Sequence, residues 1–386
     1  MFFRKNTSVR GVAFDVGTAS VSAALFELRP GDARPHVLAV LRKFHFAPLR
    51  RDTSHFSKSV THQFSALLED VQKFSGEQKP TVFLIGLSAI FYLGKTEHIH
   101  EAWPSSRAIS RGEVERLIKG AENSFLAGLD QSDVVIFETI PMKSILNGYV
   151  IEKPEGKSAS ELELWVRFGA TSRELFDALA QRIKASRPDA HIYFSTFPVS
   201  AWELMRAVYF PAHSTIMVDI GSEITEVAFL VDGVIAEVLS LPFGVMNLLM
   251  RIAEAERVEL ENALSHLRAY TGGMVHEKTE DKTRAIIKKE IQSWEENFER
   301  VWQEAARQTM ADIKMLFLGG GGVIDDLRTA VVPPLLHPDL ARGLSSSVVA
   351  PDIFRDKFGT FTGFDGPGDF GLMSLIVNYV SKQKIS

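Results

Sequence analysis

The chain has 386 residues, 45% of them apolar, and a formal net charge of −5. This size predicts two or more domains with sizeable cores, and an acidic balance without a basic block argues against nucleic-acid binding. The absence of cysteine excludes disulfides, thiolate catalysis and cysteine-ligated zinc. No apolar run reaches the roughly 18 residues that cross a bilayer, so we expect a cytoplasmic protein. His98 and His100 form the only tight histidine pair, and we expect a loop or strand edge there rather than a metal site.

The first part of the chain has the pattern of strands around one amphipathic helix. Residues 11–44 carry β-branched and aromatic positions with a turn at Pro30-Gly31, which predicts hairpin strands. Apolar side chains recur at helical spacing around 61–74, and residues 81–87 have the composition of a short buried strand. Together these elements indicate an α/β unit.

A second unit, which we expect to be an inserted α+β module, covers about residues 85–195. A capping-box pattern from Ser110 to Glu113 opens one helix, and Thr171 or Ser172 caps another. The segments between these helices have the pattern of strands, separated by a turn region rich in proline, glycine and serine. The order helix, strand, strand, helix defines the module.

The second half of the chain begins with another strand pair and becomes mostly helical from about 245 to 309. Apolar residues there follow one helical stripe: Ile287, Ile291, Trp294, Phe298, Val301 and Ala305. We expect this stripe to pack on its own domain, with a coiled-coil partner surface as the alternative. A strand at residues 315–319 then leads into a run of glycines.

Three turns carry the chemistry that the sequence suggests. Two are Asp-x-Gly hairpin turns, DVGTAS from Asp15 and DIGSEIT from Asp219, each inside an apolar strand pair. When two such turns face each other across a cleft, their backbone N–H groups can bind phosphate and their aspartates can hold a hydrated Mg²⁺. The third is the run from Gly319 to Gly322, which allows close backbone approach to an adenosine. Ordinary hairpin turns in an unrelated α/β protein are the alternative, which the order of all three turns disfavours.

In this order the motifs resemble those of the actin-like ATPase superfamily, and most closely those of the bacterial cell-division protein FtsA. The resemblance covers nearly the whole chain, and the inserted module is its most specific part. PilM-like proteins of pilus assembly share this architecture and are the second choice. The resemblance implies an actin-like α/β fold with two duplicated half-domains. The first half would comprise 1–84, 196–214 and 352–386, the inserted module 85–195, and the second half 215–351.

The resemblance also implies which residues bind ATP and Mg²⁺. Asp15 and Asp219 would hold the metal through water. The nucleotide would lie among the two phosphate turns, the ribose-side helix and the adenosine turn: Asp15, Gly17, Thr18, Ser20, Asp219, Gly221, Ser222, Thr225, Arg268, Gly319, Gly320 and Gly321. The resemblance supplies no catalytic residue.

Departures from the family pattern fall near the chemistry of hydrolysis. Ser20 stands where the family usually has a phosphate-binding lysine, and Phe197 stands where a Glu-Pro pair places a water-orienting glutamate. Glu223 replaces a glycine, and it either brings a negative charge to the phosphates or points into solvent. Ser265 and Arg268 take the places of a ribose-side glutamate and lysine. We therefore expect ATP binding with slow or absent hydrolysis.

The resemblance favours a cytoskeletal or scaffold protein of cell division that uses ATP-Mg²⁺ to set subunit geometry. A PilM-like adaptor of type IV pilus assembly is the close alternative. An active ATPase or a small-molecule kinase on the same fold is the enzymatic alternative, although the chain shows no second carboxylate motif for a kinase base.

Expected partners are further copies of the chain, in dimers or filaments, and division or pilus proteins, but no nucleic acid. FtsA proteins end in an amphipathic helix that lies in the membrane interface. Here residues 370–386 have instead the pattern of a helix packed inside the fold. Attachment to the inner face of the membrane would then be indirect, through a partner.

Overall fold

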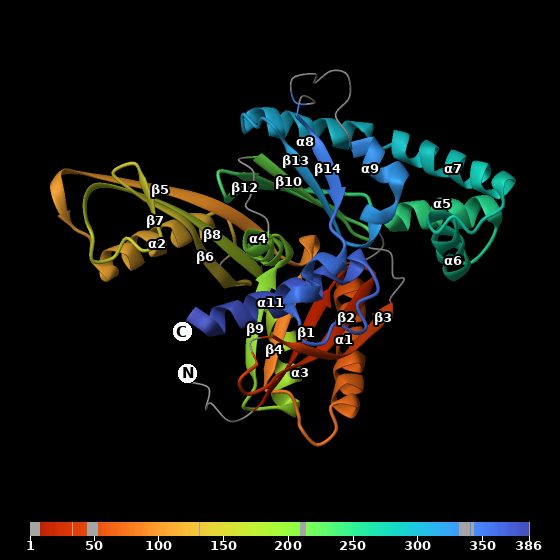
Figure 1. Cartoon of the computed structure of the whole chain (residues 1–386), viewed down its shortest axis with the longest axis horizontal. Helices are drawn as coiled ribbons and strands as arrows, with labels where there is room; N and C mark the ends of the chain where they lie inside the picture. Colours follow the sequence, from red (N-terminus) through yellow and green to blue (C-terminus); the bar gives the residue numbers. More distant parts are fainter. Residues whose placement is uncertain are drawn as a thin grey trace.

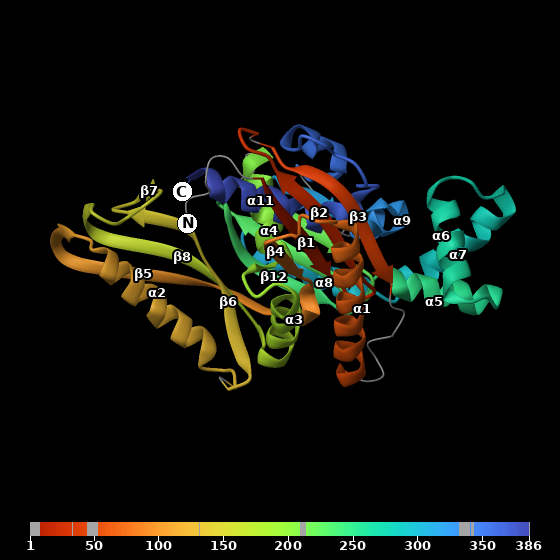
Figure 2. The same ribbon diagram turned by 90° about the horizontal axis from the view of Figure 1, so that it is seen from below.

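The computed structural model describes residues 8–32, 34–44, 53–130, 132–208, 214–331, 340 and 343–385. Within these ranges the strands form two five-stranded sheets and one four-stranded sheet. The two larger sheets lie in separate layers, and the smaller sheet projects from one side of the molecule (Figure 1). Figure 2 shows this projection from a second direction.

The first five-stranded sheet is built on the N-terminal hairpin. Its strands run in the order β3-β2-β1-β4-β9, with β1 antiparallel to β2 and parallel to β4. They are β1 (Val9–Val16), β2 (Ser20–Leu28), β3 (His36–Phe44), β4 (Val82–Leu87) and β9 (His191–Thr196). Helices α1 (Thr53–Phe74) and α3 (Arg173–Ser186) share a core with one face of this sheet. Because side chains alternate across a strand, Phe14 enters that core while Ala13 faces the opposite layer.

The second five-stranded sheet repeats this arrangement. Its order is β12-β11-β10-β13-β14, with β10 antiparallel to β11 and parallel to β13. The strands are β10 (Ser214–Ile220), β11 (Thr225–Val231), β12 (Val234–Leu241), β13 (Lys314–Leu318) and β14 (Ser345–Val348). The repeated topology puts β1 and β10, with the aspartate near the end of each, at equivalent positions.

A helical layer covers one face of the second sheet. It comprises α5 (Val245–Glu256), α6 (Leu260–Thr271), α7 (Glu277–Gln292), α8 (Glu295–Arg307) and α9 (Asp325–Val331). The predicted apolar stripe is buried in one core with the sheet, which confirms that it packs on its own domain. The stripe runs over two helices, because the chain turns at Ser293 and Trp294 between α7 and α8.

Helices α4 (Phe197–Val208) and α11 (Phe370–Ile385) lie between the two large sheets (Figure 1). Their apolar side chains share one core with residues of both sheets, among them Ala13 of β1 and Met217 of β10. Leu372 and Ile376 of α11 are fully buried, so the last helix packs inside the fold as the sequence predicted. No helix in the described ranges is both long and apolar enough to cross a membrane.

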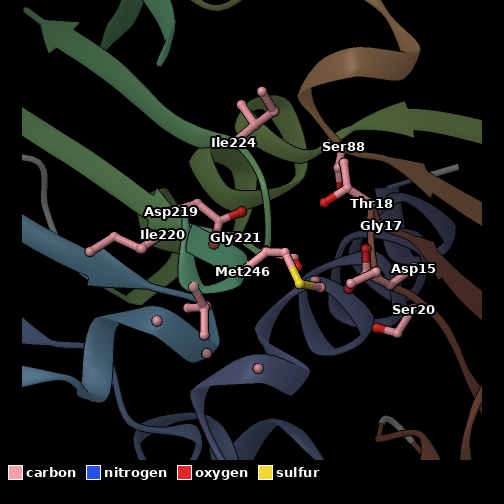
Figure 3. A pocket seen from close by; sticks show the side chains of 18 of the residues that line it. Asp15, Gly17, Thr18, Ser20, Ser88, Asp219, Ile220, Gly221, Ile224 and Met246 are labelled. Carbon is pink, nitrogen blue, oxygen red and sulfur yellow. The ribbon is translucent and has the colours of Figure 1, made fainter. Parts of the chain in front are cut away.

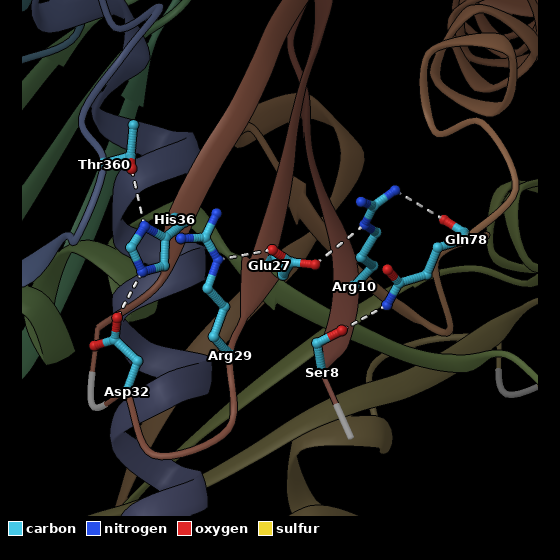
Figure 4. Close-up of polar contacts among 8 residues, drawn as sticks. All are labelled: Ser8, Arg10, Glu27, Arg29, Asp32, His36, Gln78 and Thr360. Atoms are coloured by element: carbon cyan, nitrogen blue, oxygen red, sulfur yellow. Dashed lines mark hydrogen bonds and ion pairs between the residues drawn. The ribbon is translucent and has the colours of Figure 1, made fainter. Parts of the chain in front are cut away.

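The segment before α11 is tied to the first sheet by polar contacts (Figure 4). The ring of His36 on β3 is hydrogen-bonded to Thr360 Oγ1 at 2.9 Å and to Asp32 Oδ2 at 2.6 Å. Glu27 on the neighbouring strand β2 forms ion pairs with two arginines. The contact between His36 and Thr360 fastens the later part of the chain to the edge of the first sheet.

The third sheet forms the centre of the predicted insertion. Its antiparallel strands run in the order β5-β8-β6-β7, and α2 (Arg111–Leu126) packs on one face. They are β5 (Leu93–Ala108), β6 (Val134–Leu146), β7 (Tyr149–Ile151) and β8 (Ser158–Ser172). His98 and His100 lie on the edge strand β5 and pair with glutamates of β8. Helix α3 and strand β9, whose residues fall mostly within 85–195, pack on the first sheet instead.

The helix caps agree with the sequence in part. Ser172 Oγ accepts a hydrogen bond from the N–H of Leu175, and Ser110 Oγ accepts one from the N–H of Glu113, both at 3.2 Å. The predicted capping box is only half formed. Ser110 caps the helix, but the side chain of Glu113 pairs with Arg107 of the neighbouring strand β5 and does not complete the box.

Ile376→Ala should lower the free energy of unfolding by about 2–5 kcal/mol, because it removes a buried side chain from the core between the sheets. Urea denaturation followed by circular dichroism measures this change. Met274→Ala is the matched control, since Met274 is 77% exposed and its truncation should change stability by less than about 0.5 kcal/mol. Equal stability of the two variants would contradict the burial of α11.

Candidate functional site

A pocket opens between the two large sheets, where β1 and β10 end. Its cavity of about 370 Å³ falls within the range of small-molecule sites. Its lining includes eleven of the twelve residues that the sequence assigned to nucleotide binding: Asp15, Gly17, Thr18, Ser20, Asp219, Gly221, Ser222, Arg268, Gly319, Gly320 and Gly321. Figure 3 labels six of these residues, among them Asp15 and Asp219. The fold thus brings together three motifs that are distant in the sequence.

The two Asp-x-Gly turns have the same internal geometry. The N–H of Gly17 donates to the backbone oxygen of Ser20 at 3.0 Å, and the N–H of Gly221 donates to that of Ile224 at 3.1 Å. These two donors close the turns, so they are used within the protein and not for phosphate. Thr18 and Ser20 line the pocket beside the first turn.

The two turns also contact each other across the pocket. The backbone N–H of Glu223 in the second turn donates to Thr18 Oγ1 in the first turn at 3.4 Å. Figure 3 shows Thr18 and Gly221 on opposite sides of the cavity. This contact joins the two halves of the protein at the place expected for the phosphates.

Thr225 is the one assigned residue that does not line the pocket. It is buried, and its hydroxyl donates to the backbone oxygen of Phe243 at 2.9 Å. Its neighbours Ile224 and Glu226 do line the cavity, because side chains alternate in direction along an extended chain. Thr225 therefore faces away from the pocket to which the sequence assigned it, whereas the neighbouring Glu226 lines that pocket.

Asp15 lies close to an arginine and a second aspartate. Arg42 donates through Nη2 to Asp369 Oδ1 at 2.9 Å and through Nε to Ser22 Oγ at 2.7 Å. Burial raises the pKa of Asp15 to about 6, and the charge of Arg42 opposes this increase while that of Asp369 adds to it. Asp15 is therefore mostly ionised at neutral pH, although its surroundings disfavour the charge.

Asp219 lies against the glycine run. A Cβ on Gly319 would lie 1.9 Å from Asp219 Oδ1, and the φ angle of Gly319 is +74°, so this position requires glycine. Burial, followed by the charges of Glu226 and Asp15, raises the pKa of Asp219 well above its usual value. The charge of Asp15 thus disfavours the ionisation of Asp219, and a bound cation would favour it.

Sequence reasoning missed the charged residues around the two aspartates. Glu226 of β11 lies opposite Asp219 in the strand pair, and burial raises its pKa to about 7. The register of a tight hairpin would have identified it, because directly opposite residues share one face of a sheet. Arg42 of β3 and Asp369 before α11 carry no motif, since only the tertiary fold brings them to Asp15.

The wall of the pocket on the helical side is apolar. Helices α5 and α6 supply its side chains: Val245, Met246, Leu249, Leu264 and Leu267. Arg268 follows on α6 and is exposed at the pocket. An apolar wall with glycine backbone nearby suits a flat heterocyclic base, and the arginine adds a positive charge for a ribose or phosphate group.

Phe197 lines the pocket at the first position of α4. It is 9% exposed, and its ring centre lies 6.0 Å from that of Phe370. An aromatic ring can neither accept a proton nor orient a water molecule for attack. This part of the pocket therefore supports binding more than hydrolysis.

The residues present fit a magnesium-bound nucleotide. Mg²⁺ binds carboxylate oxygens and keeps several waters, and Asp15 and Asp219 supply two carboxyls in one pocket. Hydroxyls and turn backbone surround these carboxyls, and the apolar wall lies beside the glycine run. The cavity volume and this donor set agree with one another.

Comparisons with solved structures show the fold. The chain matches a structure described as a PilM-PilN type IV pilus biogenesis complex with a TM-score of 0.62 and 14% identity, over 97% of this chain and 98% of that chain. It also matches the ethanolamine utilization protein EutJ from Carboxydothermus hydrogenoformans (TM-score 0.47, 12% identity, 96% and 89% covered). A third match is a Bacteroides thetaiotaomicron protein with an actin-like ATPase fold and unknown function (TM-score 0.45, 8% identity, 95% of each chain covered).

No protein-family model matches the chain, and no curated protein matches its sequence. The duplicated sheet topology and the match over nearly the whole chain confirm the predicted α/β fold of the actin-like ATPase type. At this level of identity the comparisons show the fold alone.

Asp15→Asn should stabilise the ligand-free protein by about 1–3 kcal/mol at pH 7.5 and should have little effect at pH 4. The pKa of Asp15 rises from 3.8 to about 6 on folding, so its ionised form costs stability that is absent below pH 4 and complete above pH 6. Urea denaturation at both pH values measures the difference. Asp281→Asn, at an exposed position, is the control. A destabilising effect of Asp15→Asn at pH 7.5 would contradict the cost assigned to this charge.

Proposed function

We propose that this protein is an actin-fold adaptor that binds Mg·ATP between its two large sheets and works mainly by holding a protein partner. The observation that carries the nucleotide part is the meeting of Asp15 and Asp219, at equivalent strand ends, in one pocket lined by both turns. Two such carboxyls are unfavourable without a cation, and the surrounding donors suit phosphate.

Each part of the pocket has a place in this proposal. Asp15 and Asp219 would hold Mg²⁺ through water, and the metal would neutralise phosphate charge. The hydroxyls of Thr18, Ser20 and Ser222 would meet the phosphates, which partly compensates for the lysine that Ser20 replaces. The glycine run and the apolar wall would take the adenosine, with Arg268 at the ribose side.

Slow or absent hydrolysis follows from Phe197. The side chain at this position cannot activate water, and the ring belongs to an apolar cluster with Phe370. An active ATPase or a kinase would need another base that faces the terminal phosphate. Glu226 and Asp219 are the buried carboxyls that the second sheet contributes to the pocket. We expect both to interact with the cation or with neighbouring residues, which leaves neither as a base.

The partner part of the proposal is supported by the likeness of fold over almost the whole chain. The matched structure is described as a complex of PilM with PilN in type IV pilus biogenesis. We infer a similar role here, in which a pilus-type protein binds the chain and attaches it indirectly to the membrane. The cell-division role of the FtsA type, self-association into filaments and the domain boundaries stay predictions.

Isothermal titration calorimetry with Mg·ATP tests the nucleotide site. Wild type should bind saturably, and the double variant Asp15→Asn with Asp219→Asn should bind at least about tenfold more weakly, because neutral amides are poor ligands for Mg²⁺. Asp325→Asn is the matched control, since this exposed aspartate follows the glycine run without lining the pocket. Undiminished binding by the double variant would remove the site assignment.

Phe197→Glu should raise the rate of phosphate release by at least about fivefold, because it places a carboxylate where the pocket lacks a water-orienting group. A coupled phosphate assay on wild type and variant measures the change. Phe197→Leu keeps the position apolar and should leave turnover at the wild-type level. If Phe197→Glu binds ATP and its turnover is unchanged, this explanation of slow hydrolysis fails; brisk turnover by wild type would favour the enzymatic alternative.

A further inference from the structure

A group of buried polar residues lies beside the pocket, where the inserted sheet meets the two large sheets. Arg167 of β8 is 1% exposed, and Tyr92, directly before β5, is 8% exposed. Glu138 of β6 and Glu226 of β11 are buried with them. Of these four residues only Glu226 lines the pocket. The group therefore spans the distance between the pocket and the inserted sheet.

The pocket end of this group has an unsatisfied acceptor. Glu226 Oε1 accepts a hydrogen bond from the hydroxyl of Tyr92. Its second oxygen, Oε2, is buried and has no hydrogen-bond partner among the described residues. Burying such an oxygen is costly, and a nearby positive charge offsets the cost. Because Asp219 lies opposite Glu226 in the strand pair, a cation held by Asp219 would act on Glu226 as well.

Arg167 has unsatisfied donors. Its Nη1 donates to Thr96 Oγ1 at 3.2 Å, whereas Nε and Nη2 are buried without a hydrogen-bond partner in the part of the chain that the structure describes. Thr96 in turn donates to the backbone oxygen of Ile235, on the second sheet, at 2.6 Å. Burial raises the pKa of both Glu226 and Glu138, and the charge of Arg167 opposes the increase in each. The positive charge of one guanidinium thus acts on two buried carboxyls.

The other carboxyl, Glu138, is held firmly in place. Its Oε1 accepts hydrogen bonds from Ser195 Oγ at 2.8 Å and from the N–H of Thr196 at 3.1 Å, and its Oε2 accepts one from Thr196 Oγ1 at 2.7 Å. Ser195 and Thr196 end β9 of the first sheet, directly before Phe197. Both carboxylate oxygens of Glu138 have hydrogen-bond partners, so Glu226, at the pocket, is the carboxyl of this group that can gain a new interaction.

We propose that Arg167 couples occupancy of the pocket to the position of the inserted sheet; this rests on the proposed binding of Mg·ATP. Without ligand, the charge of Arg167 acts on both Glu226 and Glu138. A cation bound beside Asp219 offsets the charge of Glu226, which weakens its attraction for Arg167 and loosens β8 and the Thr96 contact from the second sheet. By linkage, a partner that fixes the inserted sheet changes the affinity for Mg·ATP by the same factor.

Hydrogen–deuterium exchange of the full chain, with and without saturating Mg·ATP, tests the coupling. In wild type, Mg·ATP should increase exchange in residues 93–108 and 158–172 by at least about twofold. In Arg167→Met the increase should fall below half of the wild-type value, while calorimetry still detects Mg·ATP binding. Arg111→Met is the matched control, because Arg111 is exposed on the helix of the same module and should leave the response unchanged.

Tyr92→Phe is the second variant, for the case that Arg167→Met does not fold. It removes only one hydroxyl and leaves every charge in place. It should also reduce the response of the two strands to Mg·ATP. If wild type does not bind Mg·ATP, the proposed function fails and the coupling fails with it. If wild type binds Mg·ATP but exchange in both strands is unchanged, or if both variants respond like wild type, the coupling alone is overturned.

Discussion

The chemistry of the pocket depends on two carboxyl groups that are buried at the ends of equivalent strands. Burial is the main reason that the pKa of Asp15 rises to about 6 and that the pKa of Asp219 rises well above its usual value, and the charges of Glu226 and Asp15 add to the second increase. Two such groups cost stability when both ionise, so they do not serve the fold. A divalent cation reverses the sign of the interaction, because each negative charge then faces a positive one. The turns and hydroxyls around the carboxyls have the donors and the space for phosphate groups on that cation.

The rest of the molecule positions this pair. Two sheets of the same topology supply the two strand ends, and α4 and α11 fill the space between the sheets. The halves are not chemically equal, because Ser22 lies opposite Asp15 in its strand pair whereas Glu226 lies opposite Asp219. The second half is therefore the more acidic side of the pocket. The charge of the buried Arg167 on the third sheet lowers the pKa of Glu226 and so opposes part of the effect of burial there.

The fold and most of the pocket lining could be predicted from the sequence because their signals are local. Hairpin turns, glycine runs and helical stripes depend on neighbouring residues, and the order of three such turns predicted the actin-like fold. Thr225 was assigned to the phosphates from its place in a motif, but strand alternation turns it into the core; the same alternation would have pointed to Glu226. Arg42 in the pocket lining and Arg167 in the buried group beside the pocket could not be found in this way, since strand pairing and packing between segments distant in the sequence place them there. The placement of α3 and β9 on the first sheet is equally a product of tertiary packing.

The most direct test of the magnesium site is a crystal structure with Mn²⁺ in place of Mg²⁺ and a non-hydrolysable ATP analogue. The anomalous scattering of Mn²⁺ locates the metal independently of the protein density. We expect one peak between the carboxyls of Asp15 and Asp219, with the triphosphate between the two turns. An analogue that binds without a metal peak at this place, or a peak beside other carboxyls, would contradict the role assigned to the two aspartates.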